Sequence, residues 1–283
     1  KVADSIGINC PKTWQINTFD EVGDILSEIK YPVVLKWANP QDIVKQLSNH
    51  KIKFIKTEYA KTDVELRERL SRYKQLNQFP LIQTYCRGVG LGQFILMQNG
   101  HTVQRFQHQR IHEWPPEGGT STFCKSLNLQ THQALMQKSE ELLRTLNWQG
   151  VAMVEYRYDA ETGDAFLMEI NGRFWGSYPL ASQAGAHFGW LLYAVQFLQQ
   201  EPTAITPKAD IACRFMIPET RRLARVLLQS NEIKDEFYQN RPLVDLTHYL
   251  TSFFNPKSRY FVFSWKDPKP FFQDLWNIVK QRL

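Results

Sequence analysis

The sequence is 283 residues long, a length that suits two modest domains or one large domain with lobes. It is 43% hydrophobic and 22% charged, as is ordinary for a soluble globular protein, and no stretch is long and apolar enough to span a membrane. The net charge of +6 is spread along the chain without a Lys/Arg block, so it favours small anionic ligands over a nucleic-acid groove.

The four cysteines, Cys10, Cys86, Cys124 and Cys213, are far apart and form no CxxC pair. They indicate neither a zinc site nor a disulfide framework, so we expect a reducing, cytoplasmic location. No signal peptide is recognisable. Because the first residue is Lys1 and residues 2–7 read as the tail of a helix, we expect the chain to begin inside a larger protein.

The first third of the chain alternates helices and strands. Strands are predicted at residues 11–16, 31–37, 53–57 and 80–85, and helices at 18–30, after Pro40, and at 62–76. Two of the helices begin with a Thr-x-x-Glu capping box, at Thr18 and at Thr62. The strand at 31–37 is apolar and carries Lys36 near its end.

The middle of the chain is predicted to form hairpins. Asn99-Gly100 is a strong tight-turn signal, so residues 102–108 should return as a strand. We interpret the glycine-rich segment 88–92 as a hairpin turn, because it lacks the lysine and helix that follow a phosphate-binding loop. Residues 109–126 read as a polar loop and a candidate lid. A helix is predicted over 129–146.

The sharpest site pattern lies in residues 151–177, where two apolar runs flank a Gly/Asp-rich turn, as in a β-hairpin. Strand alternation puts Glu169, Asn171 and Arg173 on one face, and Glu155 on the partner strand can join them. Hard oxygen ligands suit Mg²⁺, and an adjacent arginine can hold phosphate oxygens. The same residue types are also typical of the solvent face of a sheet, so the pattern alone leaves both interpretations open.

The chain beyond residue 201 is rich in aromatic residues and ends in a predicted helix, 270–283. The apolar positions of this helix have helical spacing: Phe272, Leu275, Trp276 and Val279. We expect an extension that docks on the core by its aromatics, since large exposed apolar patches are rare. A partner-binding or membrane-surface helix is the alternative.

The element order predicts an α+β protein with two sheet layers rather than a doubly wound sheet. From about Gly7 to Gln200 it resembles an ATP-grasp domain, the fold of carboxylate–amine ligases, biotin carboxylase and carbamoyl-phosphate synthase. The best motif is an acid on one strand and Glu-x-Asn-x-Arg on the next, here Glu155 and the run from Glu169 to Arg173.

The resemblance implies two α+β lobes gripping ATP between them, with an aromatic-rich C-terminal extension. The expected domains are an N-terminal small lobe at 1–98, a C-terminal lobe with the metal and phosphate site at 99–205, and an extension packed on the core at 206–283. Some features depart from the family pattern. No glycine occurs between Trp37 and Lys53, where the family has a glycine-rich loop over the phosphates, and Thr84 stands where the family often has Glu.

The resemblance also implies a role for each candidate residue. Glu155, Glu169 and Asn171 would hold one or two Mg²⁺ ions, with Mn²⁺ as an alternative. Arg110 and Arg173 would be catalytic, neutralising the phosphoryl oxygens. The ATP-binding residues would be Lys36 at the phosphates, Gln83, Thr84, Tyr85 and Cys86 on the strand that reads adenine, and Gln93 near the ribose.

The implied activity is that of an ADP-producing carboxylate–amine ligase, which activates a carboxylate as an acylphosphate for attack by an amine or similar nucleophile. The expected partners are small-molecule carboxylates and amines, without nucleic acid or stable membrane insertion, and a homo-oligomer remains open. One alternative is an ATP-binding module with little or no turnover, either regulatory or a pseudo-enzyme. A second is a peripheral scaffold that uses the aromatic C-terminal segment.

Overall fold

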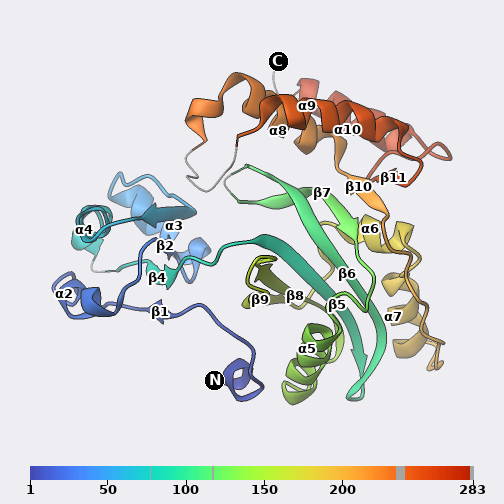
Figure 1. Cartoon of the computed structure of the whole chain (residues 1–283), viewed down its shortest axis with the longest axis horizontal. Helices are drawn as coiled ribbons and strands as arrows, with labels where there is room; N and C mark the ends of the chain where they lie inside the picture. Colours follow the sequence, from blue (N-terminus) through green and yellow to red (C-terminus); the bar gives the residue numbers. More distant parts are fainter. Residues whose placement is uncertain (77, 117, 234–239, 281–283) are drawn as a thin grey trace. The chain divides into compact units, whose positions relative to one another are not determined.

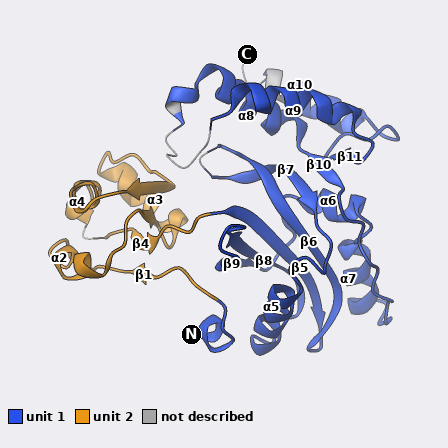
Figure 2. Ribbon diagram, in the orientation of Figure 1, with its two compact units in different colours: residues 1–8, 88–283 blue, residues 9–87 orange. Residues whose placement is uncertain are grey.

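A computed structural model describes residues 1–76, 78–116, 118–233 and 240–280 (Figure 1). It divides into two compact units (Figure 2). Residues 9–87 form the small unit, and residues 1–8 with 88–283 form the large unit. The division after Arg87 precedes the predicted boundary at residue 98, because the intervening strand pairs within the sheet of the large unit. The predicted extension also belongs to the large unit, to whose sheet it contributes two strands.

The small unit contains a four-stranded antiparallel sheet in the order β1-β4-β2-β3. Its strands are β1 (Thr13–Trp14), β2 (Val33–Lys36), β3 (Thr57–Ala60) and β4 (Leu81–Thr84). Its helices are α2 (Val22–Ile25), α3 (Pro40–Asn49) and α4 (Asp63–Ser71), with 3₁₀ turns at Leu26–Glu28 and Lys74–Leu76. Apolar side chains of the sheet, including Val33, Leu35 and Ile82, pack with Leu66 and Leu70 of α4 into one core.

Local signals explain where the helices of the small unit begin. The Thr62 cap of α4 is confirmed, since Thr62 Oγ1 accepts a hydrogen bond from the Glu65 amide at 3.2 Å; Glu65 Oε2 accepts one at 3.0 Å from the Lys61 amide, one residue before the cap. The predicted helix over 18–30 is shorter than expected. It forms only α2 and a 3₁₀ turn, and Gly23 lowers the helix propensity of this segment.

The large unit contains a seven-stranded sheet in the order β11-β10-β7-β6-β5-β8-β9, antiparallel except between β10 and β11. Its strands are β5 (Val89–Gln98), β6 (His101–Trp114), β7 (Thr120–Ser126), β8 (Gly150–Tyr158), β9 (Ala165–Asn171), β10 (Ala212–Arg214) and β11 (Ser258–Tyr260). Its helices are α1 (Val2–Ser5), α5 (Gln133–Thr145), α6 (Tyr178–Gln183), α7 (Phe188–Gln196), α8 (Met216–Leu228), α9 (Pro242–Thr251) and α10 (Lys269–Lys280), with 3₁₀ turns at Ser230–Glu232 and Ser252–Phe254.

Helices cover both faces of this sheet (Figure 1). On one face, Leu91, Ile95 and Val154 pack with residues of α1 and α5. On the other face, Phe94 and Phe106 pack with residues of α6 and α7. Because directly paired residues of neighbouring strands share a face, the register assigns every side chain of the central strands to one of these two layers.

The middle hairpins agree with the sequence in part. The turn at Asn99-Gly100 is confirmed, with φ values of 49° and 78°, as a tight turn of this type requires. The interpretation of residues 88–92 as a turn is wrong, because β5 begins at Val89 and runs through both Gly90 and Gly92. The predicted loop at 109–126 is also wrong: β6 continues to Trp114 and β7 begins at Thr120.

Aromatic residues of the C-terminal segment cluster with one another. The rings of Phe263 and Phe271 meet edge to face at 5.5 Å, so one side of α10 is turned toward the unit. The neighbouring side of α10 is turned outward, with Phe272 59% and Trp276 56% exposed. The side chain of Val279 and residues 281–283 of the predicted helix lie outside the described residues. Within the described ranges, no helix combines the length and the apolar character needed to cross a membrane.

Candidate active site on the large unit

Two carboxylates face each other across the β8–β9 hairpin. Glu155 on β8 pairs directly with Glu169 on β9, so both side chains lie on the same face of the sheet. Asn171 follows two positions along β9, and its Nδ2 donates a hydrogen bond to Glu169 Oε1 at 2.7 Å. The hairpin therefore brings together the three residues that the sequence predicts as metal ligands.

Arg110 reaches this group from β6. Its Nη2 donates to Glu155 Oε2 at 2.6 Å, although β5 lies between β6 and β8 in the sheet. The side chain crosses β5 above Gly90, where a Cβ atom would lie only 2.7 Å from Arg110 Cδ. The absence of a side chain at Gly90 thus permits the contact between the arginine and the acid.

Glu113 is a member of the group that sequence reasoning missed. Its Oε1 lies 3.6 Å from Arg110 Nη1 and 3.9 Å from Arg157 Nη2, and its Oε2 accepts a hydrogen bond from the Gly119 amide at 3.0 Å. The side chain is only 13% exposed. Glu113 could not be recognised as a site residue because the sequence around it is typical of a loop, whereas it forms the end of β6.

Charge is concentrated around Glu155. Burial raises the pKa of Glu155 above its usual range; the Arg110 guanidinium opposes this effect, and the carboxylates of Glu169 and Glu113 add to it. A divalent cation beside Glu155 and Glu169 would relieve this crowding of negative charge. The donor set therefore fits Mg²⁺, which binds proteins through one or two carboxylates and completes its shell with phosphates and water. Among the described residues, no three His, Cys, Asp or Glu side chains are grouped as a metal site.

Arg173 lies just beyond the end of β9 and is exposed. Its Nη1 donates to the Phe174 carbonyl oxygen at 3.2 Å. The guanidinium is close in sequence to the metal-ligand candidates, but the structure does not show it in contact with Glu155 or Glu169. Its catalytic role stays a prediction.

Gln93 lies on the opposite face of the sheet from Glu155. Its position on β5 is adjacent to Gly92, which pairs with Glu155, so the side chain of Gln93 points the other way. It is fully buried beneath α5, and its amide lies 2.6 Å from Ser139 Oγ and 3.3 Å from the Gln107 side chain. We therefore leave Gln93 out of the site, because the structure does not make it accessible to a ribose.

Lys36 ends β2 in the small unit and is partly exposed. The chain that follows forms α3, which begins at Pro40 after Asn39. This helix occupies the part of the sequence where ATP-grasp relatives are expected to carry a glycine-rich phosphate loop. In the small unit, Lys36 at the end of β2 is therefore followed by a helix and not by a glycine-rich loop.

The candidate adenine-reading residues lie at the end of β4. The amides of Thr84 and Tyr85 donate to the carbonyl oxygens of Lys12 at 2.9 Å and Pro32 at 3.3 Å, so these two donors are engaged within the small unit. The remaining two candidates also make local contacts: Gln83 Nε2 donates to Thr13 Oγ1 at 3.1 Å, and Cys86 Sγ lies 3.7 Å from the Thr84 carbonyl oxygen.

Comparison with known proteins identifies the fold. Residues 97–188, which include β6 to β9, match the family model described as the ATP-binding domain of the carbamoyl-phosphate synthase L chain. A crystal structure of an ADP complex of N5-carboxyaminoimidazole ribonucleotide synthetase superposes with a TM-score of 0.60 at 13% identity, over 88% of this chain and 68% of that one. The chain has an ATP-grasp fold.

Two further structural neighbours are biotin carboxylases. One is the Campylobacter jejuni enzyme in a β,γ-ATP complex, and the other is the biotin carboxylase domain of Hydrogenobacter thermophilus 2-oxoglutarate carboxylase with MgADP and bicarbonate. Each has a TM-score of 0.55 at 12% identity and covers 75% of this chain. The chain spans about half the length of either, 47%. No curated protein sequence matches it significantly.

Proposed function

We propose that this ATP-grasp chain is part of an ATP-dependent ligase that activates a carboxylate as an acylphosphate for attack by an amine or a similar nucleophile. The match to an ATP-binding domain of carbamoyl-phosphate synthase supports ATP as the phosphoryl donor. The neighbour bound to MgADP supports Mg²⁺ as the accompanying ion.

One observation carries the proposal. Two carboxylates, Glu155 and Glu169, lie opposite each other on one face, and a largely buried arginine is aimed at Glu155 across a glycine. On an ordinary solvent-facing sheet surface, no glycine is needed in the middle strand, because no arginine side chain has to cross that strand. Acid, amide and guanidinium groups in this arrangement suit the phosphates of a nucleotide and their metal ion.

The residues of this chain would act mainly by positioning and electrostatics, since phosphoryl transfer needs little covalent chemistry from the protein. Glu155, Glu169 and Asn171 would hold Mg²⁺, which when bound supplies neutralisation of phosphate charge. Arg110 and Arg173 would neutralise the oxygens of the transferring phosphoryl group. The amine would then displace phosphate from the acylphosphate, and no covalent enzyme intermediate is needed.

The binding of the rest of the nucleotide is also a proposal. Lys36 would contact phosphate oxygens, and the strand-end residues from Gln83 to Cys86 would contact the adenine. The amides of Thr84 and Tyr85 already donate hydrogen bonds within the small unit. We therefore propose that adenine is bound by carbonyl oxygens of this segment, because a carbonyl oxygen can accept a second hydrogen bond.

The test is release of ADP and phosphate with a panel of carboxylates and amines, comparing the wild type with Glu169→Gln. We expect Glu169→Gln to lower turnover by about 100-fold or more, because a metal-ligating charge is lost. Glu161→Gln is the matched control: it makes the same chemical change in the exposed turn of the same hairpin and should leave turnover unchanged. Equal turnover of wild type and Glu169→Gln would refute the proposed site.

A second candidate is an ATP-binding module without turnover. The observation that favours it is the helix α3 after Lys36, in place of the expected glycine-rich loop. Tight Mg²⁺-dependent ATP binding without phosphate release across the whole panel would support this candidate. It would also rule out the ligase activity for this chain. The charged groups around Glu155 favour the ligase, because a pure nucleotide binder has less need of them.

A further inference from the structure

The strand that carries Arg110 is irregular beside the site. The register between β6 and β7 shifts twice, once between Arg110 and His112 and again between His112 and Glu113. Bulges of this kind bend a strand and redirect its side chains, and they are frequent next to active sites. Here Arg110 is directed toward Glu155 and Glu113 toward Arg110, while His112 is directed toward the C-terminal helices.

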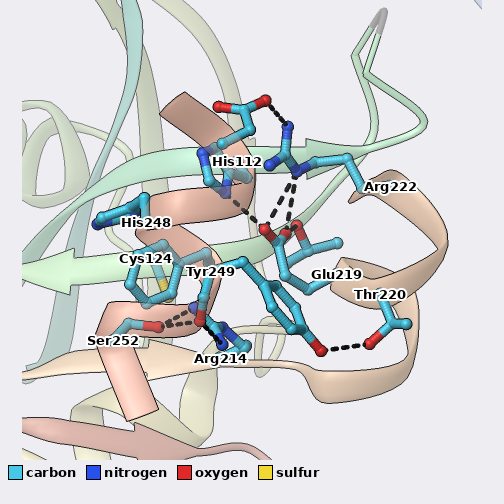
Figure 3. A network of polar contacts seen from close by, with 12 residues as sticks. His112, Cys124, Arg214, Glu219, Thr220, Arg222, His248, Tyr249 and Ser252 are labelled. Carbon is cyan, nitrogen blue, oxygen red and sulfur yellow. Dashed lines mark hydrogen bonds and ion pairs between the residues drawn. The ribbon is translucent and has the colours of Figure 1, made fainter. Parts of the chain in front are cut away.

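His112 is held by a fully buried carboxylate of α8. Glu219 Oε1 lies 2.6 Å from His112 Nδ1, which places the ring nitrogen in position to donate, and Glu219 Oε2 accepts a hydrogen bond from Thr122 Oγ1 at 2.5 Å. Glu219 is 0% exposed. Figure 3 shows His112 of β6 and Arg222 of α8 both pointing toward Glu219. The carboxylate thus bonds to both strands of the β6–β7 hairpin.

A buried arginine fixes the carboxylate from the other side. Arg222 Nε, one turn along α8, donates to both Glu219 oxygens at 3.1 and 3.2 Å, and Arg222 Nη1 donates to Asp245 Oδ2 of α9 at 2.9 Å. Burial alone would raise the pKa of Glu219. The hydrogen bond and charge of His112 and the charge of Arg222 outweigh this effect and lower it, so Glu219 is held as a carboxylate.

We propose that Glu219 is a positioning residue for the site around Glu155. By holding His112 it fixes the double bulge of β6, and the bulge directs Arg110 toward Glu155 and Glu113 toward Arg110. The C-terminal segment therefore helps to set the geometry of the phosphate-binding face as well as packing on the sheet. The proposal deepens the proposed function and rests on it.

The contacts explain why this geometry is sensitive. Arg110 touches both Glu155 and Glu113, so a change in the path of β6 moves the arginine relative to two acids at once. Misplacing a catalytic group by about 1 Å can lower a rate by about 100-fold. The loss should appear in kcat more than in the KM for ATP, because the arginine acts on charge that develops during transfer.

Turnover of the full chain tests the proposal with Glu219→Ala and Glu219→Gln. We expect Glu219→Ala to lower kcat by about 10- to 100-fold with KM for ATP changed by less than about threefold. Glu219→Gln should recover much of this loss, because the amide oxygen can still accept from His112. Asp245→Asn is the matched control: it makes the same carboxylate-to-amide change at the far end of the network, where Asp245 accepts a hydrogen bond from Arg222, and it should leave kcat within about twofold.

A double-variant comparison separates positioning from a general loss of stability. In an Arg110→Ala background, Glu219→Ala should have no further effect on kcat, since it acts through that arginine. If Glu219→Ala lowers kcat by the same factor in the Arg110→Ala background as in the wild type, the proposal is overturned. An unchanged kcat in a folded Glu219→Ala protein would overturn it as well.

A measurement without turnover distinguishes failure of this proposal from failure of the ligase function. The NMR signal of the Arg110 Nε–H group, assigned by its loss in Arg110→Lys, should shift in Glu219→Ala and stay in place in Asp245→Asn. If the wild type shows no turnover, the ligase function is refuted, and the NMR comparison still tests whether Glu219 positions Arg110. An unshifted Arg110 signal in Glu219→Ala would then refute the positioning role.

Discussion

His108 predicts a specific dependence of stability on pH. It lies on β6, is 0% exposed, and its ring meets Phe94 edge to face at 4.7 Å. Neither ring nitrogen is hydrogen-bonded within the part of the chain that the structure describes. Burial, with a smaller contribution from the charge of Arg110, lowers the pKa of His108 from 6.5 to about 3. The imidazole is therefore neutral in the folded protein at ordinary pH.

The direction of the effect follows from proton uptake. Below pH 6.5 the unfolded chain protonates His108, whereas the folded chain resists protonation until the pH approaches 3. The unfolded state binds more protons across this window, so stability falls as the pH falls. At up to about 1.4 kcal/mol per pH unit, the loss attributable to His108 is about 2 kcal/mol between pH 6.5 and pH 5, and about 4 kcal/mol by pH 3.

The assay compares wild type with His108→Leu by urea unfolding at pH 7 and pH 5, followed by circular dichroism. Other groups titrate in both proteins, so the difference between their pH dependences isolates His108. We expect the wild type to lose about 2 kcal/mol more than His108→Leu over this range. If the two proteins lose the same stability, His108 is not held neutral and the reasoning from burial is wrong.

Three further predictions follow from the large unit. Gly90→Val should lower turnover as much as Arg110→Ala does, because the added side chain meets Arg110 Cδ; a phosphate-release assay that finds Gly90→Val fully active would contradict the crossing described above. Arg222→Met should destabilise the fold by about 3–5 kcal/mol, since it removes a buried cation between two carboxylates; a urea-measured change below about 1 kcal/mol would contradict this. The double change Phe272→Ser and Trp276→Ser should alter stability by less than about 1 kcal/mol, because both side chains are more than half exposed; a shift of the thermal midpoint corresponding to more than about 2 kcal/mol would contradict that exposure.

The metal-ligand candidates could be predicted because local rules determine where they lie. Apolar alternation and a Gly/Asp-rich turn define the hairpin of β8 and β9, and two-residue periodicity places Glu169 and Asn171 on one face. The two strands of the hairpin pair with each other, so Glu155 on β8 lies beside Glu169 and Asn171 on β9. No long-range information is needed for these three residues.

The arginine and glycine contributions could not be derived in the same way. Segment 115–119 carries the turn residues of a loop, so the sequence conceals that β6 continues to Trp114 and bulges around His112. Gly90 reads as a turn residue until its neighbours across the sheet are known. The face of Gln93 depends on the strand register, and a shift of one residue reverses the face of every side chain. These features depend on pairing between strands.

The addition of β10 to the sheet has a consequence for solubility. β10 pairs with β7 from Ala212 to Arg214, so the backbone of β7 is bonded on both sides and does not form the border of the sheet. The border on this side is instead β11, a strand of only three residues that carries Arg259 at its centre. Short, charged borders resist pairing with other chains, whereas a longer strand such as β7 would invite it. The C-terminal segment thus protects the β7 side of the sheet from edge-to-edge pairing.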